Sequence, residues 1–218
     1  MKSSAETLEQ IQDEIIIAVV REESAESAEE VARAYVENGL HVIEITFTTP
    51  EAARLIQELS LLYSPIGVTF AAGSLRTSHQ AAEAHRAGAS MLVSPHTQPE
   101  VIAYAKEHDL LCVAGAATPT EIVRAWEAGA TIVKVYPARL LGGPEYFRTI
   151  RQPIRDVPML AGGPVDIEEI DAYLDAGAVA VNMAGSLAPR DLVDAKNWNA
   201  IGQRIAQAKS VVGARFPE

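Results

Sequence analysis

The sequence predicts a single (β/α)8 barrel, in which eight parallel strands alternate with helices. Short apolar runs rich in β-branched residues alternate with longer segments whose apolar residues recur every three or four positions. A glycine that can adopt a positive φ and end a helix precedes four of the expected strands, at Gly39, Gly88, Gly129 and Gly177. Their recurrence indicates one (β/α) unit used repeatedly.

Eight strands fit a closed barrel better than an open sheet. Runs such as IIIAVV and TIVKVY are apolar on both faces, as strands of a parallel sheet covered by helices are. No glycine-rich GxGxxG turn follows the first strand, which disfavours a doubly wound dinucleotide-binding sheet. We expect the strands at 15–20, 41–47, 66–72, 90–94, 110–114, 131–136, 158–161 and 179–183.

Composition indicates one domain over residues 1–218, opened by a polar helical segment at about 3–13. The formal charge of −11 argues against binding of nucleic acid or of an anionic membrane. No run of 18 apolar residues and no apolar signal sequence is present, so we expect an untargeted, cytoplasmic protein. The single cysteine, Cys112, excludes an intrachain disulfide and is expected to be a buried thiol.

Lys134 is the first candidate catalytic residue, because it alone of five lysines lies inside an expected strand. If Val133 and Val135 face the helices, Lys134 points into the barrel. A buried ammonium needs a carboxylate partner or a lowered pKa. A lysine that is partly neutral can attack a ketone to form an imine, which acts as an electron sink for C–C cleavage. The alternative is a buried ion pair with a structural role only.

Glu44 and Arg21 are the expected companions of this lysine. Glu44 interrupts the apolar strand HVIEITF at a position that points inward, where a carboxylate can transfer protons or form an ion pair with Lys134. Arg21 directly follows the first strand and can hold a substrate carboxylate through two parallel hydrogen bonds, although an arginine in this position is commonly just solvated.

Two glycine-containing turns follow the last two strands. They are Gly162–Gly163 and Gly185–Ser186, in the region where barrels of this kind build a phosphate site from backbone amides. Tight turns without a ligand are the other interpretation.

These residues lie within a longer resemblance. The sequence resembles the 2-keto-3-deoxy-6-phosphogluconate aldolases, also described as 4-hydroxy-2-oxoglutarate aldolases, along nearly its whole length. The resemblance lies in AVVR (18–21), GLHVIEITFTTP (39–50), AAGSLRT (71–77), LVSPHTQPE (92–100), AGAATPTE (114–121), TIVKVYPARLLGGPEYF (131–147), AGGPV (161–165) and GS (185–186). It implies a homotrimeric (β/α)8 barrel that uses a Schiff-base lysine without a metal or cofactor, in Entner–Doudoroff sugar-acid metabolism.

The resemblance also implies roles for residues. Lys134 corresponds to the imine-forming lysine, Glu44 to the acid/base carboxylate and Arg21 to the group that binds the pyruvyl carboxylate. The remaining positions correspond to substrate-pocket residues (Thr48, Ser74, Pro95) and to the phosphate-binding loops (Gly162, Gly163, Gly185, Ser186).

The sequence departs from the family pattern around the expected substrate. Ala71 replaces a glycine, Ala114 a proline, Ala161 a threonine and Tyr136 a phenylalanine, and Pro164 follows the glycine pair. The main prediction is cleavage of 2-keto-3-deoxy-6-phosphogluconate to pyruvate and glyceraldehyde 3-phosphate. The alternatives are the phosphogalactonate analogue, 4-hydroxy-2-oxoglutarate, decarboxylation of oxaloacetate, a sugar-phosphate isomerase, or a barrel that binds a metabolite without catalysis.

Overall fold

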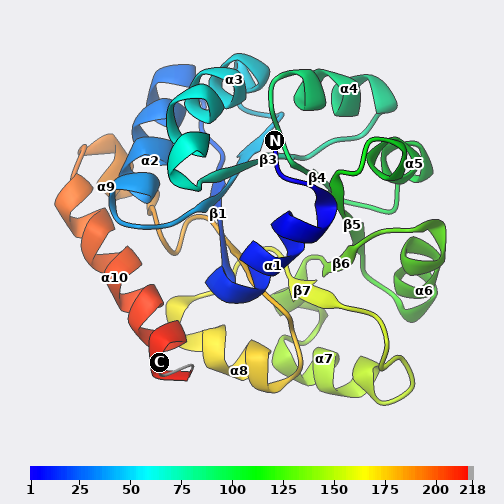
Figure 1. Cartoon of the computed structure of the whole chain (residues 1–218). Helices are drawn as coiled ribbons and strands as arrows, with labels where there is room; N and C mark the ends of the chain where they lie inside the picture. The colour runs from blue at the N-terminus through cyan, green and yellow to red at the C-terminus, as the bar shows by residue number, and fades with distance from the viewer. Residues whose placement is uncertain (216–218) are drawn as a thin grey trace.

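The predicted fold is confirmed by the computed structural model, which describes residues 1–215 and forms a closed eight-stranded barrel (Figure 1). All strands pair in parallel in chain order, and the first pairs with the eighth. The strands are β1 (Ile16–Val20), β2 (Val42–Thr46), β3 (Thr69–Gly73), β4 (Met91–Ser94), β5 (Leu111–Ala116), β6 (Ile132–Val135), β7 (Met159–Ala161) and β8 (Val181–Met183).

The helices form a ring outside the barrel, apart from α1 (Ser4–Glu14), which lies across one end of it (Figure 1). Proline occupies the first turn of α5, α6 and α7, where its missing N–H costs no hydrogen bond. The others are α2 (Ala25–Glu37), α3 (Ala52–Tyr63), α4 (Ser78–Arg86), α5 (Pro99–Glu107), α6 (Pro119–Ala128), α7 (Pro144–Arg151), α8 (Ile170–Asp175), α9 (Arg190–Asp194) and α10 (Trp198–Arg215), with 3-10 turns η1 (Ser64–Ile66), η2 (Ala138–Leu141) and η3 (Ile167–Glu169).

Alternation along each strand divides the core into two layers. On β6, Val133 and Val135 pack outward against the helices, whereas Ile132 belongs to the apolar cluster inside the barrel. The inner cluster also contains Ile17 and Val42. Cys112 packs in the outer layer, and burial raises the pKa of its thiol to about 12, as expected for an inert buried cysteine.

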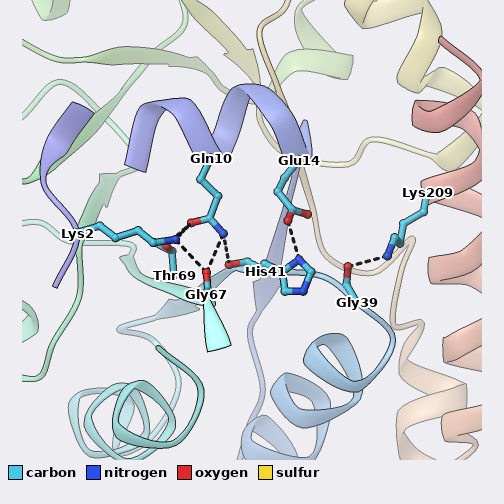
Figure 2. A network of polar contacts seen from close by, with 8 residues as sticks. All are labelled: Lys2, Gln10, Glu14, Gly39, His41, Gly67, Thr69 and Lys209. Carbon is cyan, nitrogen blue, oxygen red and sulfur yellow. Dashed lines mark hydrogen bonds and ion pairs between the residues drawn. The ribbon is translucent and has the colours of Figure 1, made fainter. Parts of the chain in front are cut away.

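The N-terminal helix closes the end of the barrel at which the strands begin. Ile11 of α1 is fully buried in the inner cluster. Figure 2 shows the polar contacts around it: the Gln10 side-chain amide donates to the backbone oxygens of His41 (3.2 Å) and Gly67 (3.0 Å), and Glu14 Oε1 lies 2.6 Å from His41 Nδ1. This end is therefore sealed by apolar packing with hydrogen bonds at its rim.

The expected third strand, 66–72, begins too early. Residues 64–66 form the 3-10 turn η1, with Pro65 in its first turn, and Gly67 follows with a φ of 97°. Strand β3 therefore begins at Thr69, and Ile66 remains 67% exposed. The four predicted helix-ending glycines do have positive φ, from 79° at Gly39 to 105° at Gly129. Within residues 1–215, no helix is long and apolar enough to cross a membrane.

Candidate active site

Lys134 lies inside the barrel near the end at which the strands finish. It follows Ile132 on the inner face of β6 and is 7% exposed. Its aliphatic stem packs on Gly162, directly after β7, where an added Cβ would overlap the lysine Cε. A glycine at this position therefore makes room for the lysine, which is a packing role that the sequence does not reveal.

Two neighbouring charges and burial set the protonation of Lys134. Burial is the largest influence and lowers the pKa of Lys134 below its usual 10.5. Glu44 Oε2, 3.9 Å from Nζ, opposes this shift, and the positive charge of Arg21 adds to it. The net direction is downward, which increases the fraction of nucleophilic amine at neutral pH.

Glu44 is nearly fully buried on β2, opposite Lys134. It follows Val42 on the inner face of the strand. Its Oε2 accepts a 2.8 Å hydrogen bond from Nδ2 of Asn182 on β8. Gly73, at the end of β3, adjoins the other carboxylate oxygen so closely that a Cβ there would overlap Oε1. Glycine is therefore required beside Glu44 as it is beside Lys134.

A pocket of about 530 Å³ opens above this pair. Lys134 and Asn182 form part of its lining, and Arg21 contributes a guanidinium. On its other side lie Ser186 and Arg204, whose Nε donates to the backbone oxygen of Ser186 at 2.6 Å. The remaining lining residues are Val19, Tyr136, Gly163, Pro164, Val165, Asp166, Ala184 and Gly185. The pocket thus combines the guanidinium groups of Arg21 and Arg204 with Lys134, whose carboxylate partner Glu44 is buried beside it.

Three other predicted substrate residues, Thr48, Ser74 and Pro95, do not line this pocket. Ser74 has a φ of 61°, and its hydroxyl accepts a 3.5 Å hydrogen bond from Arg21 Nη2. Thr48 is exposed, with its hydroxyl 3.0 Å from that of buried Thr46. Pro95 lines an adjoining pocket of about 450 Å³, which also contacts Tyr136.

Comparison with known proteins identifies this arrangement. The family model described as "Aldolase: KDPG and KHG aldolase" matches residues 8–204. The chain belongs to this aldolase family. A 2-dehydro-3-deoxy-phosphogluconate aldolase from Treponema pallidum is 31% identical over 95% of this chain and 97% of its own length. A probable 2-dehydro-3-deoxy-6-phosphogalactonate aldolase from Rhizobium meliloti is 32% identical over 79% of this chain and 81% of its own length.

Solved structures of the aldolase family share the fold. The KDPG aldolase of Legionella pneumophila superimposes with a TM-score of 0.81 at 22% identity, covering 94% of this chain and 98% of that one. Membership of the aldolase family makes the protein a carbon–carbon lyase, and its barrel is the fold that this structure shares. Among residues 1–215, no group of three or more His, Cys, Asp or Glu side chains is arranged to hold a metal ion.

Sequence reasoning missed three polar residues of the aldolase site. Asn182 carried the same signal as Lys134 and Glu44, since it is a polar residue at an inward position of an apolar strand, VAVNMAG. Thr46 shares the inward face of β2 with Glu44 and is fully buried. No pattern in the sequence pointed to Arg204. It lies on α10, and only the folded barrel brings it to the pocket.

Proposed function

We propose that this aldolase cleaves 2-keto-3-deoxy-6-phosphogluconate to pyruvate and glyceraldehyde 3-phosphate through an imine on Lys134. The observation that carries the proposal is the buried Lys134–Glu44 pair, 3.9 Å apart, beneath a pocket that also contains Arg21. A lysine with a lowered pKa supplies the nucleophile, and a carboxylate beside it can move the protons.

The reaction begins when the neutral amine of Lys134 attacks the C2 ketone, and loss of water gives a protonated imine. Glu44 then removes the proton from the C4 hydroxyl as the C3–C4 bond breaks. The electron pair of that bond moves into the imine to form an enamine, and the aldehyde leaves. Glu44 returns its proton to C3, and water hydrolyses the imine to release pyruvate and the free lysine.

Orientation of the substrate follows from the cations of the pocket. Arg21 would bind the carboxylate next to C2, with Ser74 holding its guanidinium. The phosphate would lie at Ser186, Gly185 and Gly163, near the guanidinium of Arg204. Supporting this placement, the buried Ser186 hydroxyl has no hydrogen-bond partner among the described residues. Thr48 and Pro95 would border the substrate, and Gly162 would contribute through its packing on Lys134.

The assembly and location proposed here are a homotrimer in the cytoplasm, acting in the Entner–Doudoroff route, as the family resemblance implies. A trimer of 23.4 kDa chains has a mass of about 70 kDa, which light scattering coupled to size-exclusion chromatography would measure. A mass of one or two chains would overturn this part of the proposal.

A substrate panel tests the proposed reaction. The Rhizobium meliloti relative, named for the phosphogalactonate substrate, makes the C4 epimer a second candidate. Coupled detection of pyruvate release would compare these two phosphorylated substrates with 4-hydroxy-2-oxoglutarate and oxaloacetate. We expect the highest kcat/KM for 2-keto-3-deoxy-6-phosphogluconate. A higher value for the epimer would reassign the substrate, and a higher value for an unphosphorylated acid would refute the phosphate site.

A further inference from the structure

Asn182 joins the two ionisable residues in one layer of the barrel interior. Glu44, Lys134 and Asn182 lie on β2, β6 and β8, which are alternate strands, and side chains from alternate strands form a layer in such barrels. Asn182 is 5% exposed, and its Nδ2 lies 2.8 Å from Glu44 Oε2. The bond links residues that are 138 positions apart in the chain.

Burial of an amide at this position lowers the stability of the folded state, whereas burial of an apolar side chain would not. Ala180, two positions before Asn182 and directly before β8, belongs to the apolar inner cluster. A buried amide that lacks hydrogen bonds destabilises the folded state. The carboxylate of Glu44 is the partner that the structure gives to the Asn182 side chain. Asn182 is therefore matched to Glu44 rather than to the packing of the barrel.

We infer that Asn182 is a positioning residue that holds the Glu44 carboxylate correctly oriented for proton transfer, an inference that rests on the proposed function. The two carboxylate oxygens differ in their surroundings. Oε2 accepts from Asn182 and faces Lys134, whereas no hydrogen bond among residues 1–215 uses Oε1, which lies beside Gly73. Oε1 is the oxygen left to exchange protons with the substrate.

The charges around Glu44 act together with this hydrogen bond. Lys134 on β6, Arg21 after β1 and Arg204 on α10 are the cations of the cavity, and its acidic residue, Asp166, is paired with Arg139. The adjacent positions of β3 and β1, Ala71 and Val19, carry no titratable group. Loss of the amide would leave Oε2 without its hydrogen-bond donor, so the carboxylate would no longer be fixed relative to Lys134 and the pocket.

Two substitutions of Asn182 test the inference in the full-length protein. Asn182→Leu removes the donor with a side chain of similar volume. We expect kcat for cleavage to fall about 10- to 100-fold, as for loss of a hydrogen bond to a charged group. Asn182→Asp replaces the donating amide with a second carboxyl, which cannot donate when ionised, so kcat should fall at least as far.

Trapping with pyruvate and borohydride distinguishes two causes of reduced turnover in these variants: a misplaced Glu44 carboxylate and general damage to the site. Both variants should still form the Lys134 imine, because the hydrogen bond of Asn182 within residues 1–215 goes to Glu44 and not to Nζ. Asn199→Asp, at an exposed position in the first turn of α10, is the matched control and should leave kcat unchanged. Thermal unfolding monitors folding, and Asn182→Ser replaces the leucine variant if that variant does not fold.

The inference is overturned if a folded Asn182→Leu keeps the wild-type kcat, or if it loses imine formation in parallel with turnover. Failure of the proposed function looks different: the wild-type protein itself would form no imine with pyruvate. Reduced kcat with retained trapping supports the positioning role.

Discussion

The two ends of the barrel use the same inward-facing strand positions for opposite purposes. At the end where strands begin, Ile11 of α1 packs into an apolar cluster, and Gln10 hydrogen-bonds the rim (Figure 2). At the end where strands finish, the inward positions hold Lys134, Glu44 and Asn182 below an open pocket. Apolar burial stabilises the first end, whereas desolvated charges reduce the stability of the second.

The residues that stabilise the fold and the residues that carry the chemistry therefore lie at opposite ends of the barrel axis. Substitutions at the α1 end are expected to change the free energy of unfolding without changing catalysis. Substitutions at the pocket end are expected to abolish catalysis while leaving the fold intact.

Lys134→Met should have the largest effect. We expect turnover to fall by a factor on the order of 10⁴ or more, because the reaction loses its nucleophile, while the chain still folds. Loss of the ion pair leaves Glu44 buried without its cation and lowers the free energy of unfolding, and removal of a buried ammonium offsets part of that loss. Lys209→Met is the matched control, since Lys209 donates to the Gly39 backbone oxygen far from the pocket. Steady-state pyruvate release and urea unfolding measure the two quantities. Activity above about 1% in Lys134→Met would contradict this role for the lysine.

Glu44→Gln should have the next largest effect. The amide keeps the shape of the carboxylate but cannot transfer the proton, so we expect kcat to fall about 10²- to 10⁴-fold. Imine formation with pyruvate should persist, because the nucleophilic amine of Lys134 is still present. Single-turnover cleavage and borohydride trapping together measure these steps, and full turnover in the variant would refute the acid/base role.

Ile11→Ala probes the sealed end of the barrel. Removing this fully buried side chain should lower the free energy of unfolding by about 2–5 kcal/mol while kcat stays within about twofold of wild type. The control is Ile66→Ala, because Ile66 is 67% exposed and its truncation should change stability by less than about 0.5 kcal/mol. Urea unfolding distinguishes the two, and a large loss of kcat in folded Ile11→Ala would break the separation of the two ends.

The pH dependence of stability gives a smaller effect. Burial lowers the pKa of Lys134, so between that lowered pKa and 10.5 the unfolded chain binds one proton more than the folded chain. Stability contributed through Lys134 must therefore rise with pH in this window, by up to about 1.4 kcal/mol per pH unit.

Urea unfolding of wild type and Lys134→Met from pH 7 to 10 would show this as a growing difference in favour of wild type. The raised pKa values of Cys112 and Tyr35 change stability with pH in the opposite direction. Because both proteins contain these two residues, their contributions cancel in the difference between the proteins. A difference that is constant with pH would show that the pKa of Lys134 is not lowered.

Much of the fold and part of the site follow from residue patterns. Alternation along two apolar strands was sufficient to place Lys134 and Glu44 in the barrel interior, because one polar residue between two outward-facing apolar residues must point inward. The start of β3 was predicted wrongly, since Ile66 continues an apolar run but belongs to a proline-containing turn. Apolar character alone does not distinguish an exposed turn from a strand end.

Other parts of the site depend on distances that no local pattern contains. Gly162 was interpreted as part of a phosphate loop, yet its closest neighbour is the stem of Lys134. Arg204 reaches Ser186 from α10, which packs against α2, α8 and η3. Asn182 could have been found by the reasoning applied to Lys134, but its bond to Glu44 requires the register of the closed barrel.

The assignment of Lys134 as the imine-forming residue is tested most directly by reduction with borohydride in the presence of pyruvate, followed by peptide mapping by mass spectrometry. We predict one pyruvate adduct per chain, on Lys134, absent from Lys134→Met and present in Lys209→Met. An adduct on another lysine, or no adduct under conditions in which the enzyme turns over, would contradict the account.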